Sequence, residues 1–171
     1  SNGIFSTFTG GNYDVISNVD VPVNGWHHIS AVHKLNGEVE LYLDGNLIYS
    51  QNVSTPNIIT LLGGIGYSVA SGNEFFDGLI SQASIWSKAL TQSEIQYYIS
   101  NPLNGNEVDL ACSWNFSEGS GSNVTDLSGN GHNGTINGAT WSTAAPVQYA
   151  NCTATDSIYV NITTQDDASF A

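Results

Sequence analysis

The sequence has almost no positive charge. Its 171 residues include two lysines, no arginine and four histidines, whereas aspartate and glutamate together number fifteen, so the formal net charge is -13 at pH 7. A surface of that charge repels phosphate backbones and anionic lipid headgroups. We therefore expect neither a nucleic-acid partner nor membrane insertion. The carboxylates are the ligands that a divalent cation would need, although an acidic surface most often serves solubility alone.

Long apolar runs and methionine are also missing. No run approaches the roughly eighteen apolar residues of a membrane-spanning helix, and no apolar segment follows a basic start. The sequence therefore predicts neither a transmembrane helix nor a signal peptide. Methionine is absent even at position 1, from which we expect a processed product or a fragment of a longer precursor.

Cysteine occurs only twice, as Cys112 and Cys152. An even pair in a chain rich in Gly, Ser, Thr and Asn suits an oxidising extracellular space better than the cytosol. We predict a secreted or cell-surface protein in which these two cysteines form a disulfide. The alternative is a buried Cys112, with Cys152 pairing outside this chain.

The residues that are present predict short strands separated by turns. The clearest hairpin is EVELYLDGNLIYS, in which Val39, Leu41 and Leu43 alternate with polar residues and the Asp44-Gly45 step reverses the chain. Further strands are predicted near residues 13–18, 26–33, 58–65, 75–86, 110–116 and 134–141.

One segment, LTQSEIQYYIS, predicts a helix instead. Thr91 can cap it and Glu94 can reach back to the cap amide, while Leu90 and Ile95 are spaced for a hydrophobic staple. The helix should span about residues 92–100. Many antiparallel strands with one short helix predict an all-β protein, a two-sheet antiparallel jelly roll or sandwich.

The segment DLSGNGHNGT, residues 126–135, has half of a calcium loop. Oxygen-bearing side chains at Asp126, Ser128 and Asn130 precede Gly131, as in the first half of an EF-hand loop, but the twelfth position is Asn137 and supplies no carboxylate. Another carboxylate would have to complete a calcium site, and Asp77 and Glu74 are the candidates. The alternative is a metal-free Asx turn in which Asp126 accepts backbone amides.

Two other groups of residues resemble a zinc site and a catalytic carboxylate pair, but we interpret both as structural. His27 and His28 would point to opposite faces of a strand and cannot share a zinc ion, while Trp26, His28 and Ser30 would share one face.

Glu38 and Glu40 would stand about 6.6 Å apart along one strand, near the roughly 5 to 9.5 Å that separates glycosidase carboxylates. We interpret this pair as the solvent face of an amphipathic strand and expect no catalytic residues.

Aromatic side chains make up 11% of the chain and are candidates for stacking on sugars. Trp26, Trp114 and Phe116 lie in alternating apolar patterns and are expected in the core. The residues nearer to turns and edges are our candidates for ligand binding, and the alternative for each is partial burial: Tyr13, Tyr67, Trp86 and Trp141.

Five segments in order carry a family resemblance: NGWHHISAV, LYLDGNLI, FFDGLISQASIWSKALTQSEI, LACSWNFSEGSG and DLSGNGHNGTINGATW. Together, over roughly residues 24–142, they resemble the laminin-G-like modules of the concanavalin A-like lectin and glucanase fold. The resemblance implies a two-sheet jelly roll, secretion and frequent structural calcium. It also implies a role in binding glycans or proteins within larger bacterial surface proteins.

The sequence departs from the family pattern in three places. Such modules normally carry two more strands before the NGWHH segment, and only 23 residues precede it here. Ser81, Gln82 and Ser84 replace the usual acidic pair and arginine after FDG, and Cys112 stands where glycine is common. We assign residues 1–150 to the jelly roll, with its first strands apparently missing, and residues 151–171 to a tail or the opening strand of an immunoglobulin-like repeat.

These observations favour a non-catalytic extracellular module that binds a glycan or protein ligand, with calcium as a possible structural cofactor. The first alternative is a filament or surface-assembly subunit in which the tail strand pairs with a neighbouring copy. A glycoside hydrolase is the third hypothesis.

Overall fold

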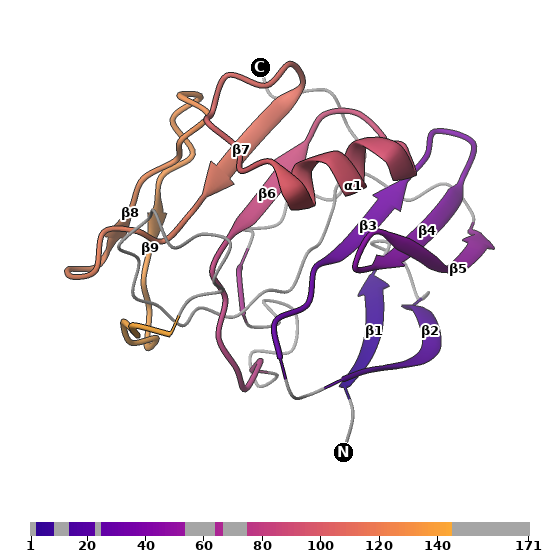
Figure 1. Ribbon diagram of the computed structural model, residues 1–171, viewed down its shortest axis with the longest axis horizontal. Helices are drawn as coiled ribbons and strands as arrows, with labels where there is room; N and C mark the ends of the chain where they lie inside the picture. Colours follow the sequence, from indigo (N-terminus) through magenta and orange to yellow (C-terminus); the bar gives the residue numbers. More distant parts are fainter. Residues whose placement is uncertain (1–2, 9–13, 23–24, 54–63, 67–74, 145–171) are drawn as a thin grey trace. The chain divides into compact units, whose positions relative to one another are not determined.

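The computed structural model describes residues 3–8, 14–22, 25–53, 64–66 and 75–144 (Figure 1). These residues form two compact units. The first contains the described residues up to Val53 together with 87–101, and the second contains 64–66, 75–86 and 102–144. No helix in these ranges is long and apolar enough to cross a membrane.

The first unit contains five antiparallel strands and the helix. Strands β3 (Ile29–His33), β4 (Glu38–Leu43) and β5 (Asn46–Asn52) form one sheet with β4 in the middle. Strands β1 (Gly3–Phe8) and β2 (Asp14–Val21) form a separate antiparallel pair. Two strands therefore occupy the short segment that precedes Trp26.

Strand β4 has a buried side chain on each of its faces. Val39 and Leu41 are almost fully buried on one face, where Val21 and Ile29 are among the side chains that pack against them. On the opposite face Tyr42 packs with Val32 of β3 and with Ile95 of the helix. The sheet therefore has an apolar contact on both sides of its central strand.

The β4–β5 turn has the two-residue form that its sequence predicts. Asp44 and Gly45 both have positive φ, 49° and 74°, which matches the right-handed twist of a hairpin. The side-chain amides of Gln92 and Gln96 both donate to the Gly45 carbonyl at 3.0 Å. A Cβ on Gly45 would lie 2.8 Å from Cγ of Gln96, so glycine allows the helix to contact this turn.

Helix α1 (Gln92–Ser100) begins with the predicted capping box. The Thr91 hydroxyl accepts from the backbone amide of Glu94, and the Glu94 carboxylate accepts from the backbone amide of Thr91 at 2.8 Å. Leu90 packs in the same cluster as the buried Ile95, as the staple requires. Lys88 adds an ion pair to Glu94 at 2.6 Å.

We expect acid to remove the contribution of this cap to stability. The Lys88 ammonium and then the Thr91 donors lower the pKa of the Glu94 carboxyl from 4.5 to about 2. A lowered carboxyl pKa contributes stability that is complete above pH 4.5 and is lost as the pH falls toward 2. Urea unfolding of the parent and of Glu94→Gln over that range should converge at low pH, and a constant difference between them would contradict the cap assignment.

The second unit contains two short strand pairs around its own core. β6 (Ala83–Trp86) pairs with β7 (Leu110–Trp114), and β8 (Asn123–Val124) pairs with β9 (Gly134–Thr135), both antiparallel. Ile80, Phe116 and Val124 form the buried centre of this core. The partly buried residues around this centre are Ile65, Ala83, Trp114, Ile136, Ala139 and Trp141.

The predicted fold class is confirmed: antiparallel strands dominate the described part of both units, and the one helix found there belongs to the first unit, consistent with a small β-sandwich. Several boundaries differ. The strands predicted at 26–33, 75–86 and 134–141 are shorter, β1 and β8 were not predicted, and most of the strand predicted at 58–65 lies outside the described residues.

Two burial predictions were wrong. Trp26 precedes β3 and is 38% exposed, so it is not a core residue. The polar face of β4 is not fully open to solvent either, because Tyr42 on that face is buried in the cluster that includes Ile95 of α1. Phe116, in contrast, is buried as predicted.

Candidate functional site

The carboxylate pair on β4 is held by a lysine. The Lys34 ammonium lies 2.6 Å from Glu40 and 3.1 Å from Glu38, so both carboxylates are on one face of the strand as predicted. Tyr42 donates its hydroxyl to Glu40 at 2.7 Å, and Ser50 donates to Glu38 at 3.0 Å. The neighbouring side chains therefore orient both carboxylates, and the single Lys34 charge offsets one of their two negative charges.

The pKa of Glu38 is shifted away from that of a catalytic general acid. The Lys34 hydrogen bond, assisted by Ser50, lowers the pKa of Glu38 below its ordinary value. Burial, together with the Glu40 hydrogen bond, raises the pKa of Tyr42 to about 12. A catalytic general acid needs a carboxyl with a raised pKa, and Glu38 has the opposite shift.

The adjacent histidines hold the end of the β4–β5 turn. His27 Nδ1 lies 2.9 Å from one oxygen of Asp44, and the other oxygen of Asp44 accepts the backbone amide of His28 at 2.9 Å. Ser30 and His28 lie on one face, with Ser30 Oγ 3.3 Å from His28 Nδ1. Burial lowers the pKa of His28 despite the charge of Asp44, which favours the neutral form of the ring.

Asp126 lies at the centre of the 126–133 loop and is only 6% exposed. One carboxylate oxygen accepts the backbone amides of Ser113 and Ser128, each at 3.0 Å, and the other accepts the amide of His132 at 3.0 Å. The Ser128 hydroxyl lies 2.8 and 2.9 Å from the two oxygens. The Asx turn that the sequence offered as an alternative is thus present.

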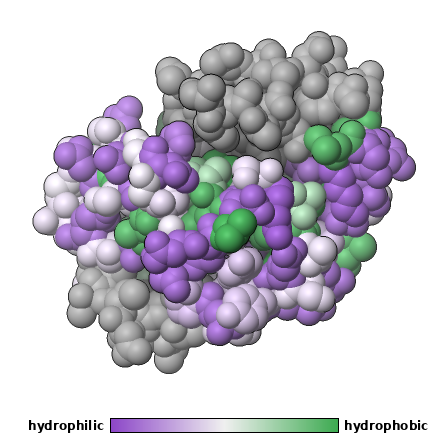
Figure 2. Space-filling view, turned by 90° about the horizontal axis from the view of Figure 1, so that it is seen from above, coloured by the Kyte–Doolittle hydropathy of each residue, from purple (hydrophilic) through white to green (hydrophobic). Residues whose placement is uncertain are grey.

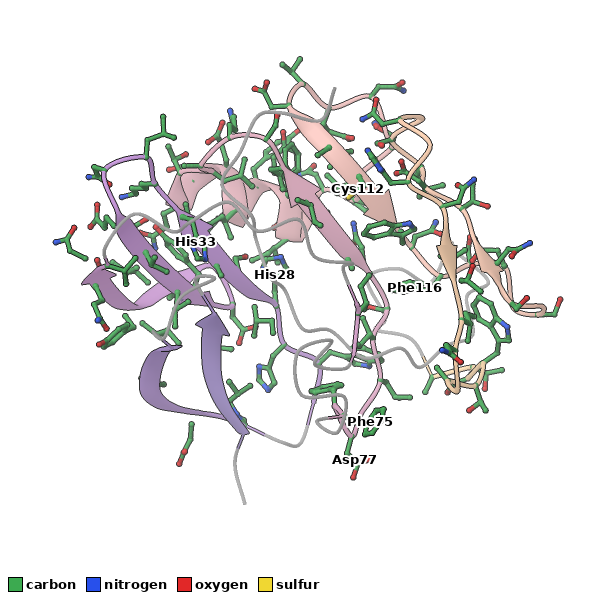
Figure 3. The ribbon with its side chains drawn as sticks, turned by 180° about the vertical axis from the view of Figure 1, so that it is seen from behind. His28, His33, Phe75, Asp77, Cys112 and Phe116 are labelled. Atoms are coloured by element: carbon green, nitrogen blue, oxygen red, sulfur yellow. The ribbon has the colours of Figure 1, made fainter. Side chains whose placement is uncertain are left out.

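The other predicted metal ligands take part in different contacts. Asn130 donates its side-chain amide to the carbonyls of Leu110 and Ala111 in β7, at 3.1 and 2.9 Å. Asp126 contacts Ser113, the residue next to Cys112. Figure 3 shows Asp77 away from Cys112, in the segment that leads into β6.

Among the side chains that the structure describes, no group of three His, Cys, Asp or Glu could hold a metal ion. Glu74 lies outside those residues, and structural calcium stays a prediction.

Asp126 also affects the chemistry of its neighbours. Burial by itself raises the pKa of the Asp126 carboxyl, but the hydrogen bonds from Ser113, Ser128 and His132 together leave it below its ordinary value. Burial, and next the negative charge of Asp126, raise the pKa of Cys112 to about 12. Cys112 is a buried free thiol in the structure. Its predicted disulfide partner, Cys152, lies outside the described residues, and the disulfide is still a prediction.

The predicted ligand-binding aromatics are not brought together as a site by any contact among the described residues. Trp86 is half-buried in β6, where it pairs with Leu110. Trp141 is half-buried in the second core, and its indole donates to the Gly121 carbonyl at 2.9 Å. Tyr13 and Tyr67 lie outside the described residues, as does the tail 151–171 on which the filament hypothesis depends.

The structure instead exposes apolar side chains on the turn before β6. Phe75 is 68% exposed, Phe76 46% and Leu79 38%, and the exposed Asp77 lies among them. We call residues 75–79 the FFDGL turn. Figure 3 shows Phe75 and Asp77 close together at the end of this segment. On the face drawn in Figure 2 hydrophilic residues predominate and hydrophobic residues form small areas between them.

The FFDGL turn is fixed at both ends. The Phe76 amide donates to the Gly66 carbonyl at 3.0 Å, and Ile80 is buried with Phe116 and Val124. A Cβ on Gly78 would lie 2.7 Å from the Phe76 ring, so the ring packs directly on the glycine backbone. Sequence reasoning missed this surface because it placed both phenylalanines in a strand, although two adjacent aromatics before Asp-Gly were a signal for a turn.

Comparison with protein families supports the resemblance. The laminin-G-like family model described as "Concanavalin A-like lectin/glucanases superfamily" matches residues 1–96, which is more than half of the 171 residues. The chain belongs to this superfamily. The match includes β1 and β2 as well as the sheet that carries Glu38 and Glu40. None of the curated proteins matches the chain.

One solved structure supports the fold of this superfamily member. A crystal structure of a "putative carbohydrate binding protein" from Bacteroides ovatus matches 75% of the chain with a TM-score of 0.60 and 20% identity. The matched region is 39% of that protein, so the chain spans about two fifths of its length. The structure of an S-layer domain-containing protein from Clostridium thermocellum matches 52% of the chain. The matched region is 45% of that structure's chain, with 19% identity and a TM-score of 0.37.

Proposed function

We propose that this concanavalin A-like superfamily member is a non-catalytic extracellular module that binds neutral glycans through the FFDGL turn. The observation that carries the proposal is the exposure of Phe75 and Phe76 on a turn that the second core holds in place. Aromatic rings present a flat apolar face at low entropic cost, and the Asp77 carboxylate beside them can accept hydrogen bonds from sugar hydroxyls.

The charge of the chain supports a neutral ligand. Both lysines are already in ion pairs, Lys34 with Glu38 and Glu40 and Lys88 with Glu94. The chain has no arginine, and its formal charge is -13. An acidic glycan would meet repulsion with no free lysine to offset it, whereas a neutral glycan would not.

A binding role also agrees with the chemistry of β4 and with the name of the Bacteroides ovatus protein. The lowered pKa of Glu38 argues against this residue as a general acid. That solved protein is named for carbohydrate binding. We propose secretion for this chain because glycan surfaces of this kind are extracellular.

We expect Phe75→Ala to weaken neutral-glycan binding about tenfold, because a stacked ring contributes about 1.4 kcal/mol. The measurement is a glycan array followed by calorimetric titration with the best neutral oligosaccharide. Val108→Ala is the matched control, since Val108 is 80% exposed in the same unit and lies outside the turn.

The dependence of the affinity on salt concentration is a second test of the same proposal. Affinity for a neutral glycan should not change between low and high ionic strength, because no charge pair is screened. Equal affinities for the parent and Phe75→Ala, or a preference for sulfated or uronic-acid glycans on the array, would refute the proposal.

A further inference from the structure

Five Asn-Gly steps lie within the described residues, at Asn36, Asn104, Asn130, Asn133 and Asn137. In such a step the glycine amide nitrogen can attack the asparagine side-chain carbonyl, because glycine has no Cβ to block the approach. The attack requires a side chain that is free to turn and an amide that is not already donating. The five steps differ in whether the structure meets these two requirements.

Two of the steps have a glycine amide that is already donating. Gly37 donates to the Lys34 carbonyl at 2.9 Å, and the Asn36 side chain also accepts the amide of Glu38 at 3.0 Å. Gly105 donates to the Glu107 carboxylate at 3.0 Å. In both steps the nucleophile would first have to break a hydrogen bond.

Two more steps have a side chain that is held. Asn130 donates to two carbonyls of β7, at 3.1 and 2.9 Å. Asn133 accepts the backbone amide of Asp126 at 2.9 Å. Turning Asn130 toward the following amide would break its two hydrogen bonds to β7, and turning Asn133 would remove the acceptor of the Asp126 amide.

Asn137-Gly138 has none of these restraints. Both residues are exposed, and neither the Asn137 side chain nor the Gly138 amide takes part in a hydrogen bond with the described residues. A Cβ added to Gly138, where φ is +88°, would meet nothing within 4 Å. The space beside Gly138 is therefore open.

We propose that Asn137-Gly138 is a site of spontaneous covalent modification in the folded protein, where the chain deamidates faster than at the other four steps. The Gly138 nitrogen forms a bond to Cγ of Asn137 and loses its proton to solvent base. The Cγ–Nδ2 bond breaks, and the nitrogen takes up a proton and leaves as ammonia, giving a succinimide. Water then opens the ring at either carbonyl and yields aspartate or isoaspartate, without a change in oxidation state.

The modification changes a segment that packs on the second core. Ile136 and Ala139, on either side of the step, both contact the buried cluster of Ile80, Phe116 and Val124. Isoaspartate adds a methylene to the main chain between these two anchors, and either product adds a negative charge. The modified protein should therefore unfold at a lower temperature than fresh protein.

The test compares the five steps within one molecule. The full chain is kept at physiological temperature in a mildly alkaline buffer, and peptide mapping by mass spectrometry follows the replacement of the amide NH₂ by OH at each asparagine. We expect Asn137 to react roughly tenfold faster than each of the other four, because their restraining hydrogen bonds must open first. Asn137→Gln should remove the fast phase and the accompanying loss of thermal stability.

A denatured sample separates structure from sequence. In strong denaturant the hydrogen bonds at the other four steps are absent, so the five rates should approach one another. An Asn137 rate in the folded protein no greater than that of any other described step, or a rate order unchanged by denaturation, would overturn the proposal.

Discussion

Asp126→Ala is expected to lower the free energy of unfolding of the second unit by about 3 to 5 kcal/mol. The substitution removes the acceptor of three backbone amides, those of Ser113, Ser128 and His132. Ser113 is fully buried, so water cannot reach its amide without opening β7. Each buried donor left without a partner costs about 1 to 3 kcal/mol, so the loss of one acceptor shared by three amides has a large effect.

Chemical denaturation followed by tryptophan fluorescence measures the effect, because the Trp114 indole donates to the His132 carbonyl at 2.9 Å in the same loop. Asp126→Asn, which keeps one acceptor oxygen, should lose less than Asp126→Ala. The matched control is Asp77→Ala, because Asp77 is exposed in the same unit. Equal losses for Asp126→Ala and Asp77→Ala would show that the loop does not depend on its carboxylate.

The same variants distinguish the two functions that the sequence allowed for Asp126. If the hydrogen bonds alone stabilise the loop, a chelator leaves the stability of the parent unchanged. If calcium also binds, a chelator lowers the stability of the parent and leaves Asp126→Ala unaffected. Because the folded pKa of Asp126 is lowered, its contribution is complete above its ordinary value of 3.8 and is lost as the pH falls further.

Local sequence signals predicted local structure well. The Asp44-Gly45 turn and the Thr91 capping box depend on residues a few positions apart, and each formed as its sequence indicates. The spacing of Asp126 and Ser128 likewise indicated the Asx turn, in which the Ser128 amide donates to the Asp126 carboxylate. In these segments the interacting groups are close in the chain, so their geometry follows from the backbone.

Contacts between distant segments could not be predicted in this way. The polar pattern of β4 indicates a solvent face, but Ile95 of α1 packs on Tyr42. The residue pattern of β4 alone cannot predict a contact with the helix. One partner of Asp126 is Ser113, thirteen residues away, and Ile80, next to the FFDGL turn, packs with Phe116 and Val124. The candidate binding surface therefore emerged only with the tertiary structure.

Gly105→Ala is expected to cost about 2 to 5 kcal/mol, the other large effect in the second unit. Gly105 has a φ of +90°, which strains an L-residue, and a Cβ there would overlap the carbonyl oxygen of Leu127 and lie 2.9 Å from its carbonyl carbon. The obstacle is backbone, which cannot rotate away as a side chain can. Leu127 is itself fixed, since its amide donates to the Ser113 carbonyl at 2.8 Å.

Gly121→Ala separates the steric effect from the conformational one. Gly121 has a similar φ of +82° in the same unit, but a Cβ there would meet nothing within 4 Å, so only the backbone strain of about 1 to 2 kcal/mol should appear. Equal denaturation midpoints for the two alanine variants would refute the close approach of Gly105 to Leu127.

The double variant of Gly105→Ala with Asp126→Ala should lose less than the sum of the single losses. Both changes disrupt the packing of the same loop. Once one change has disrupted it, the other can remove little further stability.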